Sequence, residues 1–103
     1  IYELGLVEAE SIHQNECFAA ALQFAKAEGI VPAPEPTHAI AAAIREALRC
    51  KESGEEKVIL TALCGHGHLD LAAYEQYLAG ELVDYDYPEE KVAEAMTKVP
   101  VLP

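Results

Sequence analysis

The residues best suited to chemistry lie in one short stretch, residues 64–68 (CGHGH), which directly follows an apolar run. In open α/β sheets, ligands bind just beyond the carboxyl ends of strands. Gly65 and Gly67 lack side chains, so the backbone there can pass close to a ligand. Cys64 adds a thiol at the same place. These residues are the first candidate binding site, and a tight turn without any ligand is the alternative.

The same stretch also carries donors of the kind that bind metals. His66, His68 and Asp70 occupy alternate positions, and zinc takes such donors in tetrahedral sites. The spacing resembles the first half of the His-x-His-x-Asp-His motif of metallo-β-lactamase-like hydrolases, but Leu71 stands where that motif has its last histidine. Histidines that only form hydrogen bonds within the loop are therefore the favoured interpretation. No metal ligand is assigned, and zinc stays a minor alternative.

Glu35 is the second candidate, because it lies in a stiff connector. Residues 30–36 (IVPAPEP) contain three prolines, each of which fixes a φ angle and removes an amide donor. A rigid backbone around a carboxylate is one way to organise a site in advance. An exposed acid that interacts with the dipole of the next helix is the competing interpretation. His38, just beyond, could support such a site as a neighbour of its ligand-binding residues, or it could be a buried histidine on the helix face.

Around these residues the periodicity predicts an α/β pattern. Residues 1–9 and the run 58–63 are predicted strands, the second buried on both faces as in parallel sheets. Four helices are expected. The first starts at Ser11 with a Ser11–Gln14 capping box and stops at Gly29; the others cover about 37–50, 71–78 after an Asp70 cap, and the segment from Pro88 to Pro100. The predicted fold class is a short parallel sheet flanked by helices, with residues 1–103 as one unit.

Composition narrows the range of partners. Among 103 residues, 18 Asp and Glu face 7 Lys and Arg, a net charge of −11. Such a charge argues against nucleic acid and against anionic membrane surfaces. No apolar run approaches the roughly 20 residues that span a bilayer. Three cysteines without paired spacing are typical of a reducing compartment, so we expect a cytoplasmic protein with no disulfide framework.

Three segments together resemble tryptophan synthase β chains. Residues 28–35 (EGIVPAPE) followed by 38–40 (HAI) are similar to a family segment, and the form with Pro34 and Ile40 is most like the divergent second branch of β chains. Upstream, residues 14–18 (QNECF) with Phe24 and Ala25 resemble the preceding helix. Downstream, residues 58–67 resemble the family's strand followed by a glycine-containing turn. The resemblance covers about residues 12–80.

The resemblance implies a pyridoxal-phosphate enzyme that makes L-tryptophan from L-serine and indole. In that family a serine faces the pyridine nitrogen of the cofactor where this sequence has Cys64, a weaker hydrogen-bond donor. Gly65 and Gly67 would pass beside the cofactor ring, and Glu35 matches the family's carboxylate near it. Pro36 replaces the family's usual serine. The resemblance further implies a larger three-layer α/β domain, a homodimer, and an α subunit as a further partner.

Other parts of the family's site are not found in these residues. The Schiff-base lysine and the acid–base glutamate lie in the family's N-terminal half, and the glycine- and serine-rich loop that holds the phosphate is not found in these residues, so no catalytic residue is assigned here. We expect this sequence, which begins at Ile1, to be the C-terminal part of a longer β chain, inactive alone and completed by the remainder of that chain. A small non-catalytic binding or oligomerisation module of the same fold is the alternative.

Overall fold

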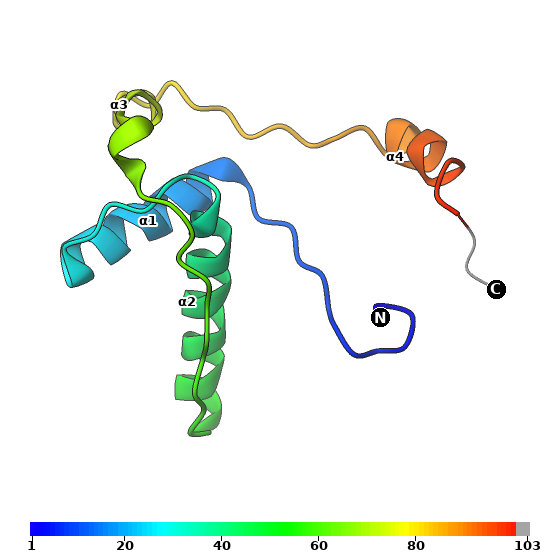
Figure 1. Cartoon of the computed structure of the whole chain (residues 1–103), viewed down its shortest axis with the longest axis horizontal. Helices are drawn as coiled ribbons and strands as arrows, with labels where there is room; N and C mark the ends of the chain where they lie inside the picture. Colours follow the sequence, from blue (N-terminus) through cyan, green and yellow to red (C-terminus); the bar gives the residue numbers. More distant parts are fainter. Residues whose placement is uncertain (101–103) are drawn as a thin grey trace.

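The structure, a computed structural model, describes residues 1–100 and is built from helices (Figure 1). The described helices are α1 (Gln14–Glu28), α2 (Pro36–Ser53), the short 3-10 helix η1 (Gly67–Leu69), α3 (Leu71–Leu78) and α4 (Glu89–Met96). Helix α1 packs mainly against α2 and also touches α3. In Figure 1, residues 80–88 form an arm that leads away from these three helices to α4. No helix in residues 1–100 is both long and apolar enough to span a bilayer.

The predicted parallel sheet is wrong. Residues 1–100 contain no strand, and their one β-type pairing is an isolated antiparallel bridge between Pro32 and His66. Residues 1–6 form a turn, in which Gly5 N donates to Tyr2 O over 2.9 Å. The run 58–63 is extended but exposed, with Val58 and Leu60 at 99% and 96%. A strand requires a second strand that pairs with its backbone N–H and C=O groups, and no such strand lies beside this run in the described chain.

The first helix begins later than predicted. Its N-cap residue is His13 rather than Ser11, and the His13 side chain forms no hydrogen bond with the first turn of the helix. The Gln14 side chain donates to Val83 O over 2.6 Å, so it does not reach back to Ser11. The Asn15 backbone N–H donates instead to Asp84 Oδ1 over 3.0 Å. This bond gives one of the unpaired N–H groups in the first turn a partner that lies 69 residues further along the chain. At the other end Gly29 is left-handed, as predicted.

The remaining helices follow the sequence more closely. Helix α2 has a proline in its first turn, as predicted, but runs on to Ser53 and stops at the left-handed Gly54. Asp70 precedes α3 as expected, although its side chain makes no capping bond. Helix α4 starts directly after Pro88 and ends at Met96, before Pro100. Helix positions are predictable here because residues close in sequence determine them.

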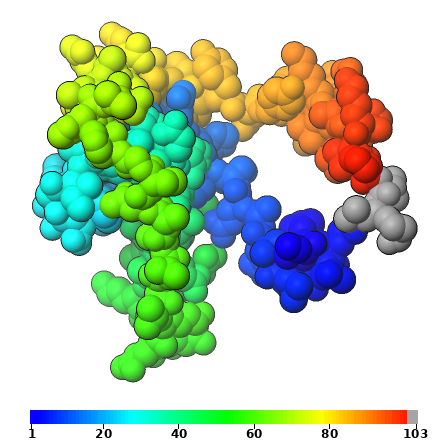
Figure 2. All heavy atoms as spheres, viewed as in Figure 1, coloured from blue at the N-terminus to red at the C-terminus, as the bar shows by residue number. Residues whose placement is uncertain are grey.

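The core is small and divided into two parts. Phe18, Ala21 and Tyr74 form one buried cluster, and Ala20, Ile40 and Ala41 form the other between α1 and α2. The radius of gyration is 16.5 Å, against about 13 Å for a compact domain of 100 residues. Figure 2 shows the consequence: the N-terminal turn (residues 1–6) and α4 stand apart from the helical cluster, with an open gap beside them. The described residues therefore resemble one layer of a protein more than a closed globule.

Candidate functional site

The two candidate regions, the connector 30–36 and the loop 64–68, lie side by side. Gly67 N donates to Val31 O over 2.7 Å, and Ala33 N donates to Gly65 O over 3.4 Å. These two bonds flank the Pro32–His66 bridge. The structure thus joins the glycine-containing loop to the proline connector through backbone contacts, over more than 30 residues of sequence.

The two glycines are required by this contact within the chain. A Cβ at position 67 would lie 2.6 Å from Pro32 O and 2.8 Å from Val31 Cγ1. A Cβ at Gly65, whose φ is +85°, would lie 3.2 Å from Ala33 Cβ. Sequence reasoning attributed both glycines to the approach of a ligand. The geometry supplies a second reason, the close packing of the loop on the connector.

Tyr74 of α3 holds the same contact from behind. Its hydroxyl donates to Pro32 O over 2.5 Å, and its ring packs edge to face against Phe18 with centroids 5.0 Å apart. Burial raises the pKa of the Tyr74 phenol, and the charge of Asp70 adds to the effect. Sequence reasoning identified Tyr74 only as a helix residue. A tyrosine on the apolar face of a helix is the available signal, because a buried phenol requires a hydrogen-bond partner.

Glu35 lies at the start of α2 with helical backbone angles (φ −62°, ψ −52°), and its side chain is exposed. It borders a hollow of about 240 Å³. This hollow, called the α1–α2 hollow below, is lined by Gln14, Cys17, Phe18, Pro34, Glu35, Thr37 and His38. Cys64 is exposed and does not line the α1–α2 hollow. The loop therefore meets the connector at residues 31–33, while Glu35 opens to the other side of Pro34.

Cys17 and Thr37 form the buried floor of this hollow. They are 2% and 1% exposed. Burial raises the pKa of the Cys17 thiol, an effect that the neighbouring Thr37 hydroxyl opposes. The Thr37 hydroxyl also donates to Pro34 O, which ties the first turn of α2 to the connector. The sequence does not reveal the neighbours of Cys17, because no local pattern relates positions so far apart.

The zinc alternative finds no support in the geometry. Within residues 1–100, no three His, Cys, Asp or Glu side chains come together as a metal site. His66 Nδ1 accepts the His68 amide over 3.3 Å, and the two rings meet edge to face with centroids 4.7 Å apart. The histidines thus form hydrogen bonds and ring contacts within the loop.

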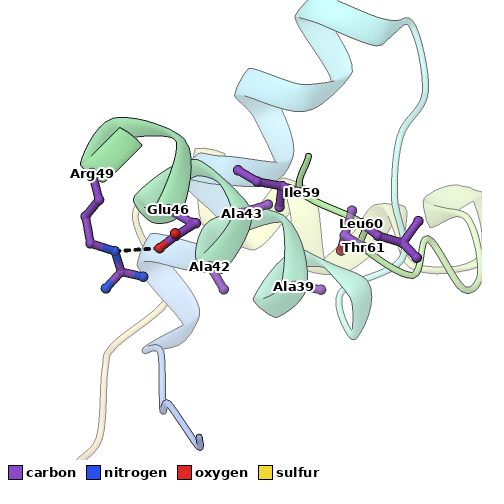
Figure 3. A pocket seen from close by; sticks show the side chains of 8 residues that line it. All are labelled: Ala39, Ala42, Ala43, Glu46, Arg49, Ile59, Leu60 and Thr61. Atoms are coloured by element: carbon purple, nitrogen blue, oxygen red, sulfur yellow. Dashed lines mark hydrogen bonds and ion pairs between the residues drawn. The ribbon is translucent and has the colours of Figure 1, made fainter. Parts of the chain in front are cut away.

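A second, shallower depression of about 360 Å³ separates α2 from the extended run (Figure 3). Its lining is Ala39, Ala42, Ala43, Glu46, Arg49, Ile59, Leu60 and Thr61. The Glu46 carboxylate accepts from Lys57 over 3.2 Å and from Arg49 over 2.8 Å, and these cations lower its pKa. The Lys57–Glu46 ion pair connects the start of the run to α2, whereas the Arg49–Glu46 pair lies within α2, and Leu60 remains exposed to solvent.

Taken together, these features form one open wall rather than an enclosed cavity. A stiff connector and a glycine-containing loop are locked together, and an exposed thiol, an exposed carboxylate and an exposed apolar run surround them. Small-molecule sites normally enclose most of the ligand, so such a wall requires further walls.

Comparison with known proteins finds relatives of most of this chain. No family model matches the chain. Tryptophan synthase beta chain 2 of Aquifex aeolicus is 62% identical over 84 residues, which are 82% of this chain and 19% of that protein. The same-named protein of Methanosarcina mazei is 63% identical over 78 residues (76% and 18%), and tryptophan synthase beta chain of Pyrococcus horikoshii is 58% identical over 82 residues (80% and 18%).

The chain spans about a fifth of the length of these relatives. Most of it is homologous to a segment of tryptophan synthase β chains, which confirms the resemblance predicted from its motifs.

Proposed function

We propose that this chain is the C-terminal part of a pyridoxal-phosphate lyase of the tryptophan synthase β type, which forms L-tryptophan from L-serine and indole. The identity of about 60% with β chains over about 80% of the chain carries this proposal. The residues proposed to face the cofactor are Glu35, Cys64, Gly65 and Gly67. The proposal also includes a cytoplasmic location, a homodimer, and an α subunit as a further partner.

The exposed groups of the wall fit the cofactor from one side. The Cys64 thiol and the Glu35 carboxylate are both exposed and therefore available to a ligand. A thiol is a weak donor, so Cys64 would give the pyridine nitrogen a neutral, weak partner and leave it largely unprotonated. The cofactor, when bound, supplies the electron sink for chemistry at the serine carbons.

Other residues of this chain hold and shape the wall. The Gly67–Val31 hydrogen bond and the Tyr74–Pro32 hydrogen bond keep the loop against the connector. This preorganisation positions Cys64 without requiring the loop to fold around the ligand. The Lys57 ammonium is within 3.2 Å of Glu46 and 3.0 Å of Glu55, an arrangement suited to an ion pair and not to a Schiff base. The lysine that binds the cofactor is therefore sought in the rest of the protein.

Turnover by the complete natural protein tests the proposal. The protein is expected to show the visible absorbance of bound pyridoxal phosphate and to convert indole and L-serine to L-tryptophan. Cys64→Ala is expected to shift the absorbance, and Cys64→Ser to restore the family's hydroxyl. Cys50→Ala is the matched control, because Cys50 lies on α2 with its Sγ 3.9 Å from Glu46 Oε1. Cofactor bound without tryptophan formation would reject the proposal.

A non-catalytic binding or oligomerisation module remains a second candidate, favoured by the exposed apolar run with Val58 and Leu60. It predicts that the natural protein neither binds the cofactor nor forms tryptophan, and that it self-associates through this run. Sedimentation of the natural protein and of its Leu60→Ser variant separates the two candidates: dissociation by Leu60→Ser in a protein that lacks cofactor absorbance would favour the module.

A further inference from the structure

Cys17 and His38 make a side-chain contact that the proposed function does not yet use. The Cys17 Sγ lies 3.3 Å from His38 Nδ1. Cys17 is almost fully buried in the first turns of α1, whereas His38 is exposed in the first turn of α2. This contact joins the two helices at the start of α2, which Glu35 precedes as its N-cap residue.

The proton of this pair is more favourably placed on sulfur. Burial raises the pKa of the Cys17 thiol, so the thiol remains protonated at neutral pH and acts as a donor. Besides the Thr37 hydroxyl, which also neighbours the thiol, it has two acceptors within reach, His38 Nδ1 at 3.3 Å and Ile12 O at 3.9 Å, and of these two the shorter contact is the stronger bond. A neutral imidazole whose Nδ1 accepts carries its proton on Nε2.

His38 and Glu35 share one face of α2. They are three positions apart, a spacing that places side chains on the same side of a helix. Both line the α1–α2 hollow, with Cys17 below them. An imidazole fixed from below therefore presents its N–H on the face that carries the Glu35 carboxylate.

We propose that the Cys17 thiol donates to His38 Nδ1 and is a positioning residue, which holds the Nε2–H of His38 as a hydrogen-bond donor beside Glu35. The matching ligand is a small polar group with an acceptor atom for His38 and a donor for Glu35. That this ligand belongs to the cofactor site rests on the proposed function. The thiol–imidazole bond itself does not.

Infrared spectroscopy of the complete natural protein tests the bond directly. The S–H stretching band of Cys17 is identified by its loss in Cys17→Ser, and a donating thiol absorbs at lower wavenumber than a free one. Because His38 is exposed, His38→Ala is expected to leave the fold intact and to move the band to higher wavenumber. His13→Ala, which removes another exposed histidine, is the matched control and is expected to leave the band in place. A Cys17 band that His38→Ala does not move would overturn the proposal.

Cofactor binding tests the positioning role. Cys17→Val keeps a buried side chain of similar size but has no donor, and we expect it to weaken cofactor binding roughly threefold to tenfold, the effect of one hydrogen bond. Cys17→Ser retains a donor and is expected to recover most of this loss. Equal binding by the Val and Ser variants would overturn the positioning role. A protein that shows the His38-dependent band shift but never binds the cofactor would reject the proposed function and leave the thiol–imidazole bond standing.

Discussion

The sharpest test of the contact between loop and connector is Gly67→Ala. The backbone of Gly67 is not left-handed, so alanine introduces no φ strain there and acts only through the space that its Cβ requires. That Cβ would lie 2.6 Å from Pro32 O, 2.8 Å from Val31 Cγ1 and 3.1 Å from Tyr74 Cε2. The nearest of these atoms belongs to the backbone of a proline-fixed connector, which cannot turn aside as a side chain can.

The expected cost follows from two contributions. Overpacking a tight contact of this kind costs about 1–3 kcal/mol. When the loop moves away to relieve it, the 2.7 Å bond from Gly67 N to Val31 O is lost, which adds about 0.5–1.5 kcal/mol. We therefore expect Gly67→Ala to reduce the free energy of unfolding by about 1.5–4.5 kcal/mol, the sum of these two ranges.

Urea unfolding of the complete protein measures this loss, read from the midpoint at constant slope. Gly29→Ala is the matched control: its φ is +70° but nothing lies within 4 Å of the added Cβ, so its cost is backbone strain of roughly 1 kcal/mol. Val31→Ala combined with Gly67→Ala is not expected to restore stability, because Pro32 O remains in the way. An unchanged midpoint for Gly67→Ala, or full recovery in the double variant, would refute the close packing of position 67 on the connector.

Three further predictions concern the same helices. Tyr74→Phe removes the hydrogen bond to Pro32 O and should lower the free energy of unfolding by about 1–3 kcal/mol in urea titration, with an unchanged midpoint as the contrary result. Folding raises the pKa values of Cys17 and Tyr74 from 9.0 and 10.0, so the folded state keeps these two protons to higher pH than the unfolded state does. The free energy of unfolding should therefore be constant below about pH 9 and should fall as the pH rises through the raised values. Cys17→Ser and Tyr74→Phe should each make that fall smaller. Arg45→Gln removes the paired contacts to Glu16, both 2.7 Å, and should cause a small loss of thermal stability that 1 M salt abolishes, whereas a loss independent of salt would mean that packing is responsible.

The helices were predictable from sequence because their signals are local. Gly29 ends α1 and a proline opens α2, both as expected from residues within a turn of each helix end. The start of α1 was not predictable by the same reasoning. Its Gln14 side chain bonds to Val83 O, and its Asn15 amide to Asp84, across 69 residues of sequence. A capping box is only one way in which the Gln14 side chain and the first backbone N–H groups can find hydrogen-bond partners, and a distant segment can provide those partners instead.

The candidate site shows the same division. The loop and the connector lie side by side, but Cys64 does not line the hollow that Glu35 borders, so the expectation that both residues face one ligand stays a prediction. The expectation that Gly65 and Gly67 let the backbone pass close to a ligand stays a prediction, and within the described residues the group that lies close to both glycines is the connector. The Cys17–His38 contact could not be predicted, because it depends on how α1 and α2 cross.

The failed strand prediction has a physical explanation that bears on function. An apolar run such as 58–63 indicates burial, and burying one side chain of this size stabilises a protein by about 1.5–3 kcal/mol. Val58 and Leu60 gain none of this here, since they are almost fully exposed along α2. The pattern in the sequence and the exposure in the structure agree only if other polypeptide covers the run. Under the proposed function that polypeptide is the rest of the β chain, and covering the run would also close the site over Cys64, which follows Leu63 directly.

Leu60→Ser in the complete protein should then reduce both stability and cofactor affinity, whereas Leu48→Ser, an exposed leucine on α2, should change affinity little.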